Sequence, residues 1–231
     1  MISIVLPTYN ERENLEGILN AIRKYVDADI LIVDDNSPDG TGDIADKLKK
    51  KYRNVDVLHR TAKNGLGYAI LDGFKHCSSD VVGVMDADFS HPPAVLKKMI
   101  ESIKQHDMVI ASRYIPGGGT DESWSGLRRF ISKFAIIMVY PLIKIKDPMS
   151  GFFLVRRSAI GGIELNPESC KICLEILVKG RIRSVAEIPY IFTNRKAGKS
   201  KIMNTKQILK YIKHVIGLYA YRLRGFLHTT A

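Results

Sequence analysis

The stretch Val81-Val82-Gly83-Val84-Met85-Asp86-Ala87-Asp88 joins an apolar run directly to two carboxylates. The apolar run predicts a buried β-strand. Because side chains of an extended segment alternate between its faces, Asp86 and Asp88 point the same way, with only Ala87 between them. Two uncompensated anions beside a buried strand repel each other, and a hard divalent cation with oxygen ligands removes that cost. The pair indicates either a metal site or an acidic turn that ends a strand, and neighbouring segments must decide.

The strand belongs to a regular alternation of strand-like and helix-like segments. Strands are predicted over residues 2–6, 30–33, 55–58, 81–85 and 108–111, and helices over 11–25, 42–51, 68–76 and 94–104. This order is typical of α/β units around a mostly parallel sheet. Ligands of such sheets gather beyond the carboxyl ends of the strands. Polar segments 7–11 and 34–40 and the Asp86 pair follow three of these strands, so all should lie on one edge.

Length and composition predict one globular domain, or one domain with an appendage. The chain has 231 residues, of which 45% are hydrophobic. Cys77, Cys170 and Cys173 lack the second Cys or His pair of a structural zinc site, so we expect reduced core thiols. We expect no cleavable signal, because the N-terminus lacks a basic start and a long apolar core. The apolar run 134–143 is too short to span a bilayer, and we expect a cytoplasmic protein.

The net charge of +11 suggests three kinds of partner: nucleic acid, an anionic membrane face or a phosphorylated small molecule. Residues 1–101 are nearly balanced, and most of the excess follows Arg113. No Gly-x-Gly-x-x-Gly follows the first strand and no Walker-type loop is present, which disfavours a dinucleotide dehydrogenase and a P-loop enzyme. A metal together with arginines remains as the way to hold phosphates.

Three segments carry a resemblance to a known family. Pro7-Thr8-Tyr9-Asn10-Glu11, Val33-Asp34-Asp35-Asn36-Ser37-Pro38-Asp39-Gly40-Thr41 and Met85-Asp86-Ala87-Asp88 resemble, in order and spacing, the nucleotide-sugar domain of glycosyltransferase family 2. The details are similar to polyprenyl-phosphate mannose synthases, and segments 63–67, 111–114, 147–153 and 195–201 agree. The resemblance implies a GT-A-like α/β fold with a mostly parallel sheet flanked by helices, a Rossmann-like nucleotide-sugar domain. It also implies a catalytic domain over 1–205, with a nucleotide-sugar half at 1–113 and an acceptor half at 114–205, and a C-terminal amphipathic helix over 206–231.

The resemblance also implies a set of residues for the nucleotide sugar. They are Pro7, Tyr9, Glu11, Val33, Asp35, Asp86, Ala87, Asp88, Arg113, Arg195 and Lys201. Tyr9 can pack on a base, and Glu11 and Asp35 can accept hydrogen bonds from guanine or ribose. The simpler alternative is that residues 10–11 begin a helix and 35–39 form a turn. For Asn10 we adopt this alternative and expect an ordinary helix cap.

For the metal, the resemblance implies Mg²⁺ or Mn²⁺ held by Asp86, Asp88 and Ser90, the last at a position that is Gln in some relatives. The departing diphosphate gains negative charge in the transition state, which a metal and cationic side chains stabilise. By resemblance Asp88, Arg113 and Arg128 are the catalytic residues. The alternative is that Arg113 is a surface residue at a strand end and that Arg195 to Lys201 form a flexible basic loop. We favour the functional interpretation, because Gly198 with its flanking Lys199, Ser200 and Lys201 resembles a mobile loop that binds phosphate.

The acceptor implied by the resemblance is a lipid monophosphate. Its second pKa is about 6, so it is ionised at neutral pH and needs no general base. Residues 123–146 place an apolar stripe at helical spacing beside basic residues, and by resemblance Arg128 and Ser132 receive the acceptor phosphate. Residues 206–231 repeat this pattern. Each stripe could instead face the core of the domain, and a basic amphipathic helix can also lie on a membrane surface.

The resemblance therefore implies transfer of mannose from GDP-mannose to dolichyl or polyprenyl phosphate, with inversion, by a protein peripheral to the cytoplasmic membrane face. A separate membrane-anchoring subunit is compatible with this reading. UDP-glucose with the same acceptor is the nearest alternative. The alternative of another class, a basic nucleic-acid-binding module, needs exposed aromatic residues among the cations. Most tyrosines fall at helical or turn positions instead, so we expect no nucleic acid partner.

Overall fold

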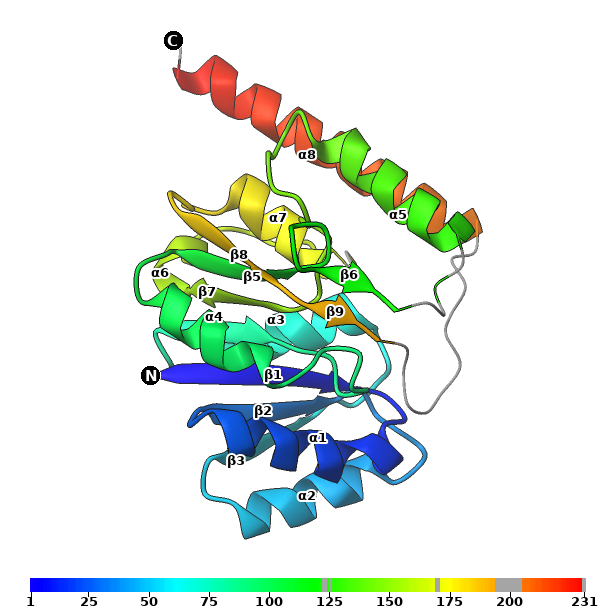
Figure 1. The fold of residues 1–231 in the computed structure, drawn as a ribbon, viewed down its shortest axis with the longest axis vertical. Helices are drawn as coiled ribbons and strands as arrows, with labels where there is room; N and C mark the ends of the chain where they lie inside the picture. The colour runs from blue at the N-terminus through cyan, green and yellow to red at the C-terminus, as the bar shows by residue number, and fades with distance from the viewer. Residues whose placement is uncertain (122–123, 125, 169–170, 194–204, 230–231) are drawn as a thin grey trace.

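Seven strands form the central sheet of the computed structural model, in the order β3-β2-β1-β4-β7-β5-β8 (Figure 1). Their bounds are Ile2–Thr8 for β1, Asp29–Asp34 for β2, Val55–His59 for β3, Val81–Val84 for β4, Met108–Ser112 for β5, Phe153–Arg156 for β7 and Val185–Pro189 for β8. The structure describes residues 1–121, 124, 126–168, 171–193 and 205–229, without the side chains of 127, 128, 205–207 and 225–229. The predicted strands correspond to β1 to β5, and the mostly parallel sheet is confirmed.

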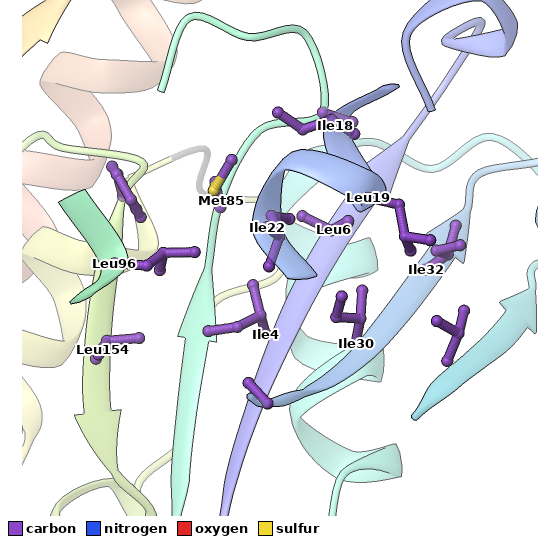
Figure 2. Close-up of a cluster of buried hydrophobic side chains, with 14 of the residues drawn as sticks. Ile4, Leu6, Ile18, Leu19, Ile22, Ile30, Ile32, Met85, Leu96 and Leu154 are labelled. Atoms are coloured by element: carbon purple, nitrogen blue, oxygen red, sulfur yellow. The ribbon is translucent and has the colours of Figure 1, made fainter. Parts of the chain in front are cut away.

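Helices cover both faces of the sheet. On one face lie α1 (Arg12–Tyr25), α2 (Thr41–Lys51) and α4 (Val95–Ile103), and on the other lie α3 (Leu66–His76), α6 (Arg157–Ile160) and α7 (Ile172–Lys179). Figure 2 shows the core beneath α1, where Ile18, Leu19 and Ile22 pack against isoleucines and leucines of β1 and β2. Burying such side chains contributes roughly 1.5–3 kcal/mol each. This packing fixes β1 and β2 relative to α1, and with them the positions at which the two strands end.

Strand β7 departs from the predicted alternation because it runs antiparallel to both of its neighbours. Its residue Phe153 lies opposite Val84 of β4 and Ile110 of β5. A side chain at Gly83 would bring Cβ to 2.4 Å from Cδ2 of Leu154 on β7. The glycine in the middle of the buried strand therefore allows the close approach of β7.

Helices α5 (Gly126–Val139) and α8 (Thr205–Thr229) lie side by side above α7 (Figure 1). The hydroxyl of Tyr211 donates to the carbonyl of Ala135 at 2.6 Å, and that of Tyr219 donates to the carbonyl of Met138 at 2.8 Å. The helix expected over 123–146 is shorter than predicted, since it ends at Val139 and Pro141 cannot continue it. Within the described ranges, no helix has the length and apolar character needed to cross a membrane.

A small second sheet joins the loop after β5 to the segment after β8. It pairs β6 (Gly119–Thr120) with β9 (Ile191–Phe192) in parallel. Of the predicted core thiols, Cys173 is buried, and burial raises its pKa well above the usual value. Cys77 is half-buried and free, and Cys170 lies outside the described residues.

Candidate active site

The parallel strands β1, β2, β4 and β5 end at one edge of the sheet, which we call the rim. Thr8 lies opposite Asp34, and Val5 lies opposite Val84, so the segments that follow these strands emerge together. The rim lies on the right in Figure 1. Four predicted site segments meet there: 9–11, Asp35, 86–90 and Arg113.

Asp35 is buried at the rim and held by the chain itself. Its carboxylate forms an ion pair with Arg60 and accepts the backbone N–H groups of Asn64 at 3.3 Å and Gly65 at 2.9 Å. Arg60 also reaches Asp72, with 3.0 Å between Nε and Oδ2. Charge-assisted bonds of this kind fix the orientation of a carboxylate. Asp35 is therefore a preset acceptor, and Arg60, 25 residues away, was not predicted to support it.

Tyr9 and Glu11, which are predicted to hold the nucleoside, follow β1 directly, next to Asp35, whose backbone N–H donates to the carbonyl of Thr8 at 2.9 Å. The ammonium of Lys63 lies 3.3 Å from the ring centroid of Tyr9, a cation–π contact on one face of the ring. The expected cap at Asn10 is wrong: Asn10 has φ 60°, and Glu11 is the N-cap residue of α1. The backbone N–H of Glu11 donates to Thr41 Oγ1 at 2.9 Å. The left-handed turn at Asn10 therefore lets the chain leave β1 and enter α1 directly.

Pro7 and Val33 lie opposite each other in the register of β1 and β2. The side chain of Val33 is fully buried on the α3 side of the sheet, where a Cβ added at Gly73 would lie 3.2 Å from Val33 Cγ2. A ligand at the rim could reach only the main chain of Val33. Pro7 is partly exposed, and its predicted role in holding the turn stays a prediction.

Asp86 and Asp88 follow β4, with the buried Ala87 between them. Oδ1 of Asp88 accepts the backbone N–H of Ser90 at 3.0 Å and its hydroxyl at 2.6 Å. Asp88 is buried, whereas Asp86 is partly exposed. Ser90 thus orients Asp88, and this contact favours a supporting role for Ser90 over the predicted direct metal contact.

Asp86 and Asp88 could supply two ligands to a divalent cation, with other groups completing its coordination. Among the described residues, no group of three or more His, Cys, Asp or Glu side chains could hold a metal alone. Two carboxylates that leave the remaining positions to phosphate oxygens and water match the usual Mg²⁺ site of phosphate-handling enzymes. The site therefore suits a metal that arrives with a diphosphate.

His91 is a site residue that was not predicted. Its Nδ1 accepts the backbone N–H of Asp86 at 3.0 Å, and its ring stacks on Phe152 with 5.1 Å between centroids. The rings of Tyr190 and Phe192 meet it edge-on. A Cβ at Gly151 would lie 3.5 Å from His91 and 3.9 Å from the Asp86 oxygens. The short segment after Asp88 therefore folds back to support Asp86.

Arg113 is paired within the protein. Its Nε lies 2.7 Å and its Nη2 2.8 Å from the two oxygens of Asp147, whose Oδ2 also accepts the backbone N–H of Arg113 at 2.9 Å. The Arg113 and Asp147 side chains are 10% and 0% exposed. Burial opposes the charge, but the bonds to Asp147 raise the pKa of Arg113 above its usual value. Any diphosphate contact of Arg113 must use the guanidinium N–H groups that Asp147 leaves over.

The residues predicted to bind the acceptor phosphate, Arg128 and Ser132, lie on α5. The hydroxyl of Tyr114 donates to Ser132 Oγ at 2.7 Å. Arg128 lies one helical turn before Ser132 on α5, but its side chain lies outside the described residues. Arg195 and Lys201 also lie outside them. The structure thus brings Ser132 to the Arg113 end of the rim, and the positions of those three cationic side chains stay predictions.

Solved structures with the same fold define the class of this domain. M. tuberculosis glucosyl-3-phosphoglycerate synthase, in a complex with Mn²⁺, UDP-glucose and phosphoglyceric acid, superposes with a TM-score of 0.69 at 17% identity, covering 96% of this chain and 79% of that one. S. aureus TarS 1–349 with UDP-GlcNAc gives 0.67 at 17% identity, covering 94% and 66%. The fold is that of a GT-A-type α/β domain.

The particular family follows from sequence comparison. The family model "Glycosyl transferase family 2" matches residues 3–163. The chain is 45% identical to the dolichol-phosphate mannosyltransferase of Pyrococcus furiosus over 94% of its length, but spans only 63% of that relative. It is 32% identical to the Saccharomyces cerevisiae enzyme of that name, covering 95% and 87%, and 37% identical to the undecaprenyl-phosphate mannosyltransferase of Micrococcus luteus, covering 86% of each. The chain belongs to glycosyltransferase family 2, as the motifs at 7–11, 33–41 and 85–88 predict.

Proposed function

We propose that this chain transfers mannose from GDP-mannose to dolichyl or another polyprenyl monophosphate, with inversion at the sugar carbon. The observation that carries the proposal is the Asp86–Asp88 pair at the rim, in a chain whose 45%, 37% and 32% identical relatives are named for mannose transfer to lipid phosphates. In this proposal residues 1–113 hold the donor and residues 114–205 hold the acceptor.

On the donor side, Tyr9 would stack on the base and Asp35 would accept its hydrogen bonds. Arg60 and two backbone N–H groups already orient Asp35, so its remaining lone pair can meet a base without reorganisation. Lys63 lies on one face of Tyr9, so the base would use the other face or displace the ammonium. Glu11 would contribute from the entrance of α1.

Asp86 and Asp88 would hold Mg²⁺ or Mn²⁺ against the diphosphate. The metal, when bound, would supply positive charge to the departing diphosphate. Ser90 keeps one oxygen of Asp88 in place, and His91 holds the main chain at Asp86. Arg113, Arg195 and Lys201 would add positive charge around the same phosphates.

On the acceptor side, Arg128 and Ser132 of α5 would bind the lipid phosphate. A phosphate monoester is largely ionised at neutral pH, so attack on the sugar needs no side chain to remove a proton. Arg128 and Ser132 would instead offset the repulsion between two anionic substrates and hold the attacking phosphate oxygen in line with the sugar carbon.

The lipid would come from a membrane on which the protein lies peripherally, at the cytoplasmic face. On α5, Phe130, Phe134 and Ile137 are 67%, 54% and 66% exposed. On α8, Leu209, Ile216 and Leu223 are 60%, 63% and 65% exposed. We call these six exposed residues the apolar ridge; lysines 133, 210 and 213 of the same two helices are also exposed. Exposed apolar residues together with lysines on the same helices suit the interface of an anionic bilayer, with or without a separate anchoring subunit.

A donor panel tests the proposal. Purified protein is incubated with a polyprenyl phosphate in detergent and with radiolabelled GDP-mannose, GDP-glucose, UDP-glucose or UDP-GlcNAc, with and without EDTA. We expect label in the lipid fraction with GDP-mannose only, and its loss with EDTA until Mg²⁺ or Mn²⁺ is restored. Transfer from UDP-glucose instead would refute the donor assignment.

A further inference from the structure

Tyr114 occupies the point where the donor and acceptor parts of the site meet. It follows Arg113 directly, and its hydroxyl reaches Ser132, 18 residues further along the chain. The main chain under Tyr114 is well fixed, because Asp147 binds both the backbone N–H and the side chain of Arg113. The hydroxyl therefore extends from a rigid base toward α5.

Because Ser132 accepts a hydrogen bond from Tyr114, the proton of the Ser132 hydroxyl must point away from Tyr114. The phenol of Tyr114 donates to Ser132 Oγ at 2.7 Å, which uses one lone pair of the serine oxygen. A serine hydroxyl has a single proton to donate. Within the described ranges, the structure shows no hydrogen bond that Ser132 Oγ donates. The proton is thus available to an anion at the surface of α5.

The other proposed acceptor residue, Arg128, lies on the same helix. Arg128 and Ser132 are four residues apart in the sequence of α5, about one helical turn. A phosphate monoester accepts hydrogen bonds through several oxygens, so it can take one from Ser132 and others from Arg128. Hydrogen bonds in a chain polarise one another, so the tyrosine strengthens the serine as a donor.

We propose that Tyr114 is a positioning residue for the acceptor: its hydroxyl orients the Ser132 proton toward the lipid phosphate. The inference rests on the proposed acceptor but not on the proposed donor. Tyr114 acts through Ser132, so its loss should weaken binding of a polyprenyl phosphate without weakening binding of the nucleotide sugar.

The test measures binding as well as turnover. The affinity for farnesyl phosphate, a short polyprenyl phosphate, is measured by calorimetry for the wild type, Tyr114→Phe, Ser132→Ala and the double variant. We expect Tyr114→Phe to weaken binding about 5- to 10-fold, as expected for one lost hydrogen bond. The double variant should match Ser132→Ala. In the transfer assay, the KM for lipid phosphate should rise, while the KM for GDP-mannose stays within about twofold.

Tyr219→Phe is the matched control, because Tyr219 also donates a hydroxyl hydrogen bond to α5, at the carbonyl of Met138. We expect it to bind farnesyl phosphate like the wild type. An equal loss in Tyr219→Phe would mean that α5 had merely loosened, and would overturn the inference. So would a further loss on adding Tyr114→Phe to Ser132→Ala. Tyr114-dependent binding without mannose transfer would instead refute the proposed donor and leave this inference standing.

Discussion

Removing the charge of Asp147 should destabilise the protein more than any surface charge change. Asp147 is fully buried and accepts three hydrogen bonds from Arg113, at 2.7, 2.8 and 2.9 Å. In Asp147→Asn, the amide NH₂ faces a donor, and a guanidinium that is 10% exposed loses its counter-charge. Breaking a buried ion pair by removing one partner costs about 3–5 kcal/mol. For a chain of this length, 1 kcal/mol shifts Tm by about 2–4 °C, so we expect a fall of about 6–20 °C.

Urea unfolding followed by circular dichroism measures the change in free energy of unfolding. The matched control is Glu101→Gln, which breaks the 2.7 Å pair between Glu101 and Lys104, both well exposed. It should cost about 0.5 kcal/mol or less. Replacing both partners, with Arg113→Met and Asp147→Leu, should cost less than Asp147→Asn alone, because no buried charge is left unpaired. A loss below about 1 kcal/mol in Asp147→Asn would refute the reasoning that Arg113 needs its buried counter-charge.

Three further changes test other parts of the molecule. Asp88→Ala should abolish transfer while the circular dichroism spectrum is unchanged, and near-normal turnover would contradict the metal assignment. Phe134→Ser should weaken binding to vesicles of anionic lipid, measured by sedimentation, about 10-fold or more, because roughly 1.5–3 kcal/mol of apolar transfer free energy is lost. Equal sedimentation would remove the apolar ridge from the membrane interface. Burial opposes the ionisation of Asp56, but bonds from Lys49 and His76 lower its pKa to about 2. The stabilisation from ionised Asp56 is present above the unfolded pKa of 3.8 and is lost as pH falls toward 2. Asp56→Asn should therefore reduce the fall of the urea midpoint between pH 4 and pH 2. A pH dependence equal to that of the wild type would show that Asp56 contributes nothing.

The alternation of segments predicted the parallel strands because each unit carries its own signal: a short apolar run, a turn and an amphipathic helix. Strand β7 carries the same local signal, and the sequence Phe153-Leu154-Val155-Arg156 does not reveal its direction. Direction depends on how the preceding segment crosses the sheet, which is a property of the whole chain. The antiparallel strand was therefore not predicted.

Within the site, the motifs predicted which segments meet at the rim, but not how their charges pair. Asp35 and Arg60 are 25 residues apart, and Arg113 and Asp147 are 34 apart. No local spacing rule covers such pairs. Asn10 shows the same limit at short range: it is a good capping residue, yet it takes a left-handed conformation, and Glu11 occupies the cap position. Local preference was overridden by the path from β1 to α1.

The reversed strand β7 has a consequence for how the two halves of the chain can move. An antiparallel strand begins where its parallel neighbours end, so the segment after α5 enters the sheet at the rim, beside Asp86, and is clamped on both edges by β4 and β5. Residues 153–156 thus lie between two strands from the first half of the chain. Strand β7 can leave this position only by breaking main-chain hydrogen bonds on both of its edges. In the proposed function, substrates would therefore enter and leave through changes in the loops of the rim, while the sheet keeps its shape.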